Sequence, residues 1–152
     1  MTRDAVPERF RTPADAARIG RIAACYRKLV GKPLVAARGD VITALWNAPP
    51  AILAHGVGDE PRFFFANRAA LAAFETDLDH LIGSLSRLSA PEPGQGERQA
   101  MLDRAAKSGF IDDYSGIRIS AKGRRFEIRS AVIWNLTDED GTRPGQAAAF
   151  QL

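Results

Sequence analysis

The order in which two hydrophobic periodicities alternate along the chain is the feature that most constrains its fold. Residues 51–66 hold two short apolar runs, "AILAHG" and "RFFFA", separated by the turn-rich "VGDEP", which predicts a β-hairpin. Residues 67–83 and 97–108 have helical spacing and are separated by the loop "SLSRLSAPEPG". The remainder returns to strands: "FIDDYSGIRIS" and "RRFEIRSAVIWNLT" flank the turn "AKG", and "GQAAAFQL" follows as a closing strand.

The long strand predicted over 125–136 has a period of two in its apolar residues. One parity holds Phe126, Ile128, Val132, Trp134 and Leu136, and the other begins with Arg125, Glu127 and Arg129. Because strand side chains alternate between faces, this pattern predicts one face on a core and one toward water or a partner.

An amphipathic helix is predicted before the first hairpin. Thr12 can cap it, Pro13 suits its first turn, and Gly31 ends it. Ile19, Ile22, Tyr26 and Leu29 recur at intervals of three and four and form one narrow apolar stripe. A shorter helix is predicted within "GDVITALWNAPP".

Composition limits the class of protein. A chain of 152 residues with 45% hydrophobic composition is suited to one domain with one core. No apolar stretch approaches the ~18 residues of a membrane span, and the start lacks a secretory signal, so the predicted location is the cytoplasm. Cys25 is the single cysteine, which excludes an internal disulfide.

Charge is concentrated at the start of the chain, although the net charge is only +3. Residues 1–30 carry seven basic and three acidic side chains. This excess is typical of a solvated helix face. Nucleic-acid binding is disfavoured because no helix-turn-helix or aromatic RNA-binding motif accompanies it.

No constellation for catalysis is present. The sequence contains no HExxH, GxSxG or phosphate-loop motif and no paired carboxylates of catalytic spacing. The prediction is that the protein is not an enzyme and binds no metal.

The strand and helix order is that of the PAS fold, and "ANRAALAAFETDLDHLIG" resembles the asparagine-capped helix and following turn of PAS domains. The chain more closely resembles the PAS-related MEKHLA family, known as small stand-alone bacterial proteins and at the end of plant homeodomain leucine-zipper transcription factors. The stretches that carry this resemblance are "HGVGDEPRFFFANRAALAAFE", "SRLSA", "GFIDDYSGIRISAKGRRFEI" and "VIWNLTDEDGTRPGQAAAF".

The resemblance implies an α+β fold, with a five-stranded antiparallel sheet and a helical lid between its second and third strands. It divides the chain into a basic flexible N-terminus (1–12), N-terminal helices (13–49) and a PAS-like MEKHLA domain (50–152). In such a fold the phenylalanine run supplies both faces of the second strand. Some PAS domains bind haem through a histidine in the lid, but His80 lies beside Asp77 and Asp79 and is interpreted as a surface or capping residue. Flavin-cysteinyl photochemistry is excluded, since residues 67–83 contain no cysteine.

A polar set would surround a cavity if the sheet curves as PAS sheets do: His55, Arg87, Ser89, Tyr114, Arg118, Trp134, Asn135 and Gln146. Two roles are open for Arg87. It could hold a carboxylate or phosphate together with its flanking serines, or it could pair with Asp112 or Asp113 and pin its loop to the third strand.

The candidate dimer interface comprises the stripe of the first helix, Ile19, Ile22, Tyr26 and Leu29, packed on a strand face around Ala131 and Ile133. The same helix could instead fold over its own sheet. The function predicted is a non-enzymatic PAS-like sensory or regulatory domain that binds a small metabolite and acts by homodimerisation or through a separate signalling partner. The alternative is a ligand-free protein interaction module.

Overall fold

The computed structural model describes residues 5–36, 39–90, 94–138, 140–141 and 144–151. Its elements, in chain order, are η1 (Glu8–Phe10), α1 (Pro13–Val30), α2 (Val41–Trp46), β1 (Ala51–His55), β2 (Phe63–Ala66), α3 (Arg68–Phe74), α4 (Leu78–Leu81), η2 (Ser86–Ser89), α5 (Gly94–Ser108), β3 (Phe110–Ile119), β4 (Arg125–Leu136) and β5 (Gly145–Gln151). The predicted order of strands and helices is confirmed.

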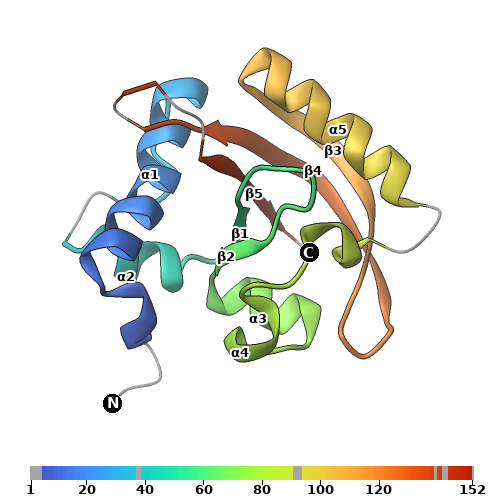
Figure 1. The fold of residues 1–152 in the computed structure, drawn as a ribbon, viewed down its shortest axis with the longest axis horizontal. Coiled ribbons are helices and arrows are strands. Elements are labelled where there is room, and N and C mark those ends of the chain that lie inside the picture. Colours follow the sequence, from blue (N-terminus) through green and yellow to red (C-terminus); the bar gives the residue numbers. More distant parts are fainter. Residues whose placement is uncertain (1–4, 37–38, 91–93, 139, 142–143, 152) are drawn as a thin grey trace.

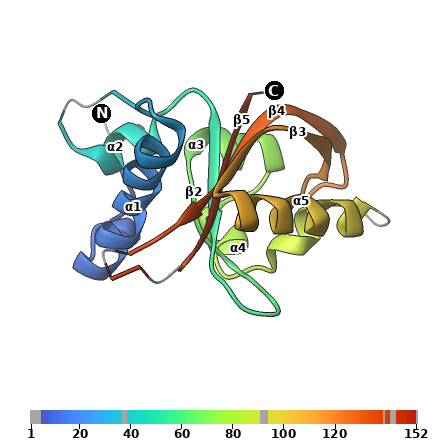
Figure 2. The same ribbon diagram turned by 90° about the horizontal axis from the view of Figure 1, so that it is seen from above.

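The strands form one antiparallel sheet in the order β2-β1-β5-β4-β3. Helices cover both of its faces, with α1 and α2 on one side and α3, α4 and α5 on the other (Figures 1 and 2). Each face therefore has its own hydrophobic core. Phe63 joins the core under α3 and α5, while Phe65 joins the core under α1, so the phenylalanine run supplies both faces as predicted.

Local capping explains where the helices begin. The Thr12 hydroxyl accepts a hydrogen bond from the Asp15 amide at 3.2 Å, and α1 ends at Gly31, whose φ of 88° is left-handed. Asn67 caps α3 and is fully buried. Its side-chain oxygen accepts from the amides of Ile52 and Ala70, and its side-chain nitrogen donates to carbonyls that include Leu45. Asn67 thus joins α2, β1 and α3 at one point.

A β-bulge in β4 changes the faces that the alternation predicted. Ser130 has a φ of 51°, and the pairing of β4 with β5 shifts between Arg129 and Val132. Phe126 and Ile128 before the bulge face the core under α3 and α5, whereas Trp134 after it faces the core under α1. The prediction that all these residues share one face is wrong, because the bulge inserts one residue and reverses the parity that follows it.

Helix α1 lies on its own sheet. Ile19, Ile22 and Tyr26 are buried there, the Tyr26 ring packs edge-on against Trp134 with centroids 4.8 Å apart, and the Trp134 indole donates to the Ile22 carbonyl at 3.0 Å. Cys25 is also buried, and its sulfur contacts Thr137 at the end of β4, as expected of a packing residue.

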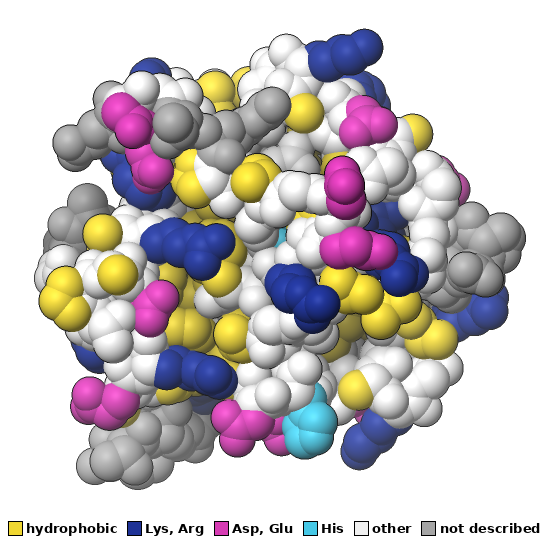
Figure 3. Space-filling model, in the orientation of Figure 1, with side chains coloured by type: hydrophobic (Ala, Val, Ile, Leu, Met, Phe, Trp, Pro, Cys, Tyr) yellow, Lys and Arg dark blue, Asp and Glu magenta, His cyan; other side chains and the backbone are white. Residues whose placement is uncertain are grey.

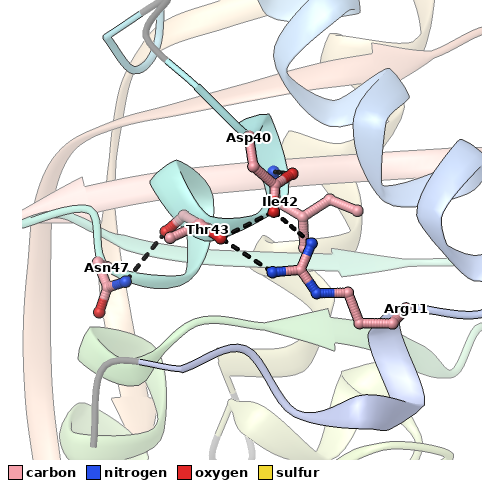
Figure 4. Close-up of polar contacts among 5 residues, drawn as sticks. All are labelled: Arg11, Asp40, Ile42, Thr43 and Asn47. Atoms are coloured by element: carbon pink, nitrogen blue, oxygen red, sulfur yellow. Dashed lines mark hydrogen bonds and ion pairs between the residues drawn. The ribbon is translucent and has the colours of Figure 1, made fainter. Parts of the chain in front are cut away.

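The described part of the N-terminal segment is anchored to the fold. Phe10 is buried against Trp46 and Phe65, and Arg11 forms an ion pair with Asp40 and donates to the Thr43 hydroxyl at 3.0 Å (Figure 4). The predicted flexible arm over 1–12 is corrected for residues 5–12, because an aromatic side chain fixes this segment. Residues 1–4 lie outside the described residues.

The surface carries interspersed charges. On the face shown in Figure 3, Lys and Arg side chains lie among Asp and Glu side chains and hydrophobic areas, without one dominant basic patch. Among the described residues, no helix is both long enough and apolar enough to cross a bilayer.

Candidate ligand cavity

A cavity lies between the sheet and the helices α3 and α5. Its volume is about 50 Å³, counted as the space open to the centres of water molecules. Most of its wall is apolar, built from Leu53, Phe63, Phe74, Leu102, Ile128, Ala131, Ile133, Ala147, Ala148 and Phe150. The polar side chains in the wall are His55, Ser89, Arg98, Tyr114, Arg118 and Gln146. A small apolar space with a few convergent polar groups is typical of a ligand site.

Most of the polar set predicted from the sequence meets at this cavity: His55, Ser89, Tyr114, Arg118 and Gln146. Tyr114 and Arg118 lie on β3, where the Arg118 guanidinium carbon lies 5.1 Å from the centre of the Tyr114 ring. Gly116 between them leaves room for that ring, because a Cβ there would lie 2.5 Å from the Tyr114 hydroxyl.

Trp134 does not line the cavity. It lies in the core on the opposite face, under α1. Ala131 and Ile133, which were predicted to receive the first helix, line the cavity instead. Both corrections follow from the bulge at Ser130, which exchanges the faces of the second half of β4.

Arg87 also lies away from the cavity wall. Its Nε donates to Glu60 at 2.9 Å in an exposed ion pair. Asp113 pairs instead with Arg104 of α5 at 2.9 Å, so the predicted Arg87 pairing with Asp113 is wrong. For Asp112, no contact with Arg87 is present among the described residues. Arg87 therefore pairs with Glu60 on the neighbouring loop and does not contribute to the cavity wall.

Asn135 and Gln146 hold α5 over the sheet. The Asn135 amide donates to the Ala106 carbonyl at 3.2 Å, and the Gln146 amide donates to the Leu102 carbonyl at 3.0 Å and to the Asn135 side-chain oxygen. Asn135 is therefore a positioning residue beside the cavity, whereas Gln146 is both a wall residue and a positioning residue.

His55 is a neutral acceptor in the wall. Its Nδ1 lies 2.8 Å from the Gly56 carbonyl oxygen, and because a carbonyl can only accept, Nδ1 carries the proton and Nε2 is left as an acceptor. Burial is the main cause that lowers the pKa of His55 to about 4. The positive charge of Arg98 acts in the same direction, and the hydrogen bond to Gly56 opposes the shift. The ring is therefore uncharged near neutral pH.

Arg98 is the wall residue that the sequence analysis missed. It lies on α5 and is only 5% exposed. The signal was present: Arg98, Leu102 and Ala105 recur at four and three residues, which places an arginine on the apolar stripe of this helix. An arginine on an apolar stripe is buried with the rest of the stripe, and a buried arginine needs a partner for its charge.

The MEKHLA domain profile matches residues 16–152. The chain belongs to the MEKHLA domain family. The match begins within α1, so the family region includes the N-terminal helices that were predicted as a separate segment.

Relatives in plants share this domain. The chain is 30% identical over 101 residues to homeobox-leucine zipper protein HOX10 of Oryza sativa subsp. indica, covering 66% of this chain and 12% of the relative. It is 31% identical over 97 residues to REVOLUTA and 29% identical over 118 residues to ATHB-8, both homeobox-leucine zipper proteins of Arabidopsis thaliana, covering 64% and 76% of this chain. The match spans 12% of REVOLUTA and 14% of ATHB-8, so it covers a small part of these proteins.

Solved structures share the fold. A PAS domain from Colwellia psychrerythraea aligns with a TM-score of 0.60 and 13% identity over 71% of this chain and 89% of that one. A light-oxygen-voltage domain studied with a flavin analogue aligns with a TM-score of 0.60 and 13% identity, over 74% of this chain and 83% of that one. An RNA-binding light-oxygen-voltage receptor aligns with a TM-score of 0.62 and 15% identity, over 72% and 31%. The MEKHLA chain has the predicted α+β PAS fold.

The residues of this MEKHLA domain do not fit the cofactors of the wider fold class. The cavity leaves no room for the three-ring system of a flavin, and Cys25 lies in the core on the other face of the sheet. His80 is 80% exposed and its Nδ1 lies 2.7 Å from Asp77, so it is a helix-capping partner on the surface and not placed to ligate a buried haem. In the described part of the chain, no three His, Cys, Asp or Glu side chains are grouped as metal ligands.

Proposed function

We propose that this MEKHLA domain is a non-enzymatic sensory or regulatory module that binds a small metabolite in the cavity and acts by dimerisation or through a separate signalling partner. The observation that carries the proposal is the cavity itself, where six polar side chains converge on an otherwise apolar space. Filling such a space with aliphatic side chains would stabilise the fold more simply, so the polar wall favours a bound ligand.

The relatives support a regulatory role. They carry this region as a small part of much longer homeobox-leucine zipper proteins. A module that senses a ligand and passes the state to another protein or segment agrees with that setting. Nucleic-acid binding by this domain is not proposed, since its basic side chains are interspersed with acidic ones on the face in view (Figure 3). The cytoplasm remains the proposed location.

The alternative is a ligand-free interaction module. It is supported by exposed hydrophobic side chains outside the cavity, Val57, Leu88 and Ile117, which are 62%, 54% and 43% exposed. Exposed apolar residues of this kind can contribute to a protein interface.

Native mass spectrometry of gently purified protein tests the proposal. We expect a small molecule to be retained and to be lost when the cavity is filled by Ala148→Leu. A matched control, Ala24→Leu, changes an exposed position on α1 and should leave retention unchanged. Protein that retains nothing, together with an experimental structure in which side chains fill the cavity, would favour the interaction module.

A further inference from the structure

Two arginines face the cavity, and no acidic side chain lies in its described wall. Arg98 from α5 is 5% exposed and Arg118 from β3 is 7% exposed. Arginine is rarely buried to this degree without a carboxylate partner. The cavity therefore holds two buried positive charges that the described protein does not neutralise.

The hydrogen bonds of these side chains are incomplete. Arg118 donates from one nitrogen to the Ile117 carbonyl at 2.9 Å, and its guanidinium faces the Tyr114 ring. Among the described residues, the Arg98 guanidinium and the Tyr114 hydroxyl have no hydrogen-bond partner. A guanidinium has five N–H donors, so most of the donors on this wall remain available to a ligand.

The charge states of the groups around the cavity also favour an anionic ligand. Burial is the main cause that lowers the pKa of Arg98 to about 10; the charge of Arg118 acts in the same direction, and Tyr114 opposes the shift. Arg98 is thus still charged near neutral pH. His55, whose pKa the charge of Arg98 helps to lower, is neutral there. An anion would be the ligand that relieves the repulsion between the two arginines.

We propose that the cavity binds a small organic carboxylate, whose carboxylate group is held by Arg98 and Arg118 and whose apolar body packs among Phe63, Phe74 and Ile133. This inference rests on the proposed ligand-binding function and specifies its chemical class. Guanidinium groups match a carboxylate in planar geometry, and the Tyr114 hydroxyl can donate a further hydrogen bond. The cavity of about 50 Å³ limits the ligand to a compact molecule.

An inorganic anion fits less well. Phosphate would occupy the space between the arginines but leave the larger apolar part of the wall without contacts, and its second charge would be desolvated there. A short aliphatic acid, which has a carboxylate and a small apolar body, satisfies both parts of the wall.

The test compares matched probes on the full chain. Acetate and propionate are titrated at neutral pH, each against its primary amide, with inorganic phosphate as a third probe, by calorimetry and by NMR shift changes at cavity residues. We expect both acids to bind about 10- to 100-fold more tightly than their amides, since each amide lacks the charge-assisted hydrogen bonds.

Variants identify the groups responsible. Arg98→Met and Arg118→Met should each weaken acid binding by about 10- to 100-fold and leave amide binding little changed. Arg104→Met is the control, since it removes an exposed positive charge from the same helix as Arg98 and should leave acid binding unchanged. If either Met variant fails to fold, Arg118→Lys and Arg98→Lys keep the charge but lose the planar fork, and should weaken binding by a smaller factor.

Three results would overturn the inference. Amides that bind as tightly as the acids, or a neutral molecule retained in native mass spectrometry when neither acid binds, would leave a ligand-binding domain without the proposed carboxylate specificity. Phosphate that binds as tightly as propionate would show that the apolar body contributes nothing. Absence of any binding, with no molecule retained, would overturn both this inference and the proposed function.

Discussion

At the residue scale, the polar wall of the cavity depends on side chains whose charge state is set by burial. His55 is kept neutral by its buried site and by the charge of Arg98, although its hydrogen bond to the Gly56 carbonyl favours the protonated form. This has a measurable consequence for stability. The unfolded chain takes a proton on His55 at a pH near 6.5, whereas the folded chain does so only at about 4.

His55→Gln should therefore reduce the acid sensitivity of the fold. Because the folded pKa is lowered, stability falls as the pH drops below the unfolded pKa, and His55 should account for a loss of about 2 kcal/mol between about pH 7 and about pH 5. Urea unfolding at a series of pH values measures this loss in the parent and the variant.

His80→Gln is the control for this measurement. Asp77 raises the pKa of His80, so the stability that His80 contributes is present at low pH and is lost as the pH rises through its folded pKa. Its removal should not lessen the loss on acidification. Equal acid sensitivity in the parent and in His55→Gln would show that His55 is protonated in the folded chain.

At the scale of single elements, the bulge in β4 decides which side chains reach the cavity. It places Ser130 in the left-handed region, with a φ of 51°. Ahead of the bulge, Ile128 faces the cavity; beyond it, Ala131 and Ile133 do so, and Trp134 turns to α1. A residue with a β-branched side chain is strained in that conformation.

Substitutions at Ser130 test the bulge directly. Ser130 is exposed, so changes there leave the cores intact. Ser130→Gly should be neutral or raise the free energy of unfolding by up to about 1 kcal/mol, and Ser130→Val should lower it by about 1 to 2 kcal/mol. Arg125→Val, at an exposed position in the same strand, should change it by less than about 0.5 kcal/mol. A stabilising effect of valine at 130 would argue that the strand is continuous there.

At the scale of the whole molecule, α1 and the sheet form one unit. Ile22 is fully buried against the sheet of its own chain and Leu29 is partly buried there. The stripe that was predicted as a dimer seam is thus used within the chain. A homodimer stays a prediction that needs another surface or an exchange of α1 between chains.

The double variant Ile22→Glu, Leu29→Glu separates these arrangements. Placing a carboxylate at a fully buried position should unfold the chain or detach α1, because the charge would lose its hydration without gaining a partner. Circular dichroism and light scattering report folding and mass together. Ala24→Glu, at an exposed position of α1, should leave both unchanged. A well-folded monomer from a dimeric parent would instead indicate that α1 lies on the sheet of a second chain.

The sequence by itself determined the order of the elements, the two hairpins, the helix caps and the fold they imply. These features depend on local patterns: helical spacing in 13–30, alternation in the strands, and capping by Thr12 and Asn67. It also identified most of the polar wall, because His55, Tyr114 and Arg118 are polar side chains at strand positions that aliphatic residues could otherwise fill.

Only the tertiary structure decided which face each residue serves. The bulge adds one residue that the sequence pattern does not indicate, and every later side chain of β4 then faces the opposite side of the sheet. Trp134 and Ile133 therefore exchange the faces that the alternation predicted. Arg98 was missed for a related reason, because a helix face is buried only when another element covers it. Hydrogen bonds from Asn135 and Gln146 to carbonyls of α5 hold this helix against the sheet. The periodicity places Arg98 on the apolar stripe of α5, but only long-range packing decides that the stripe is covered at that position.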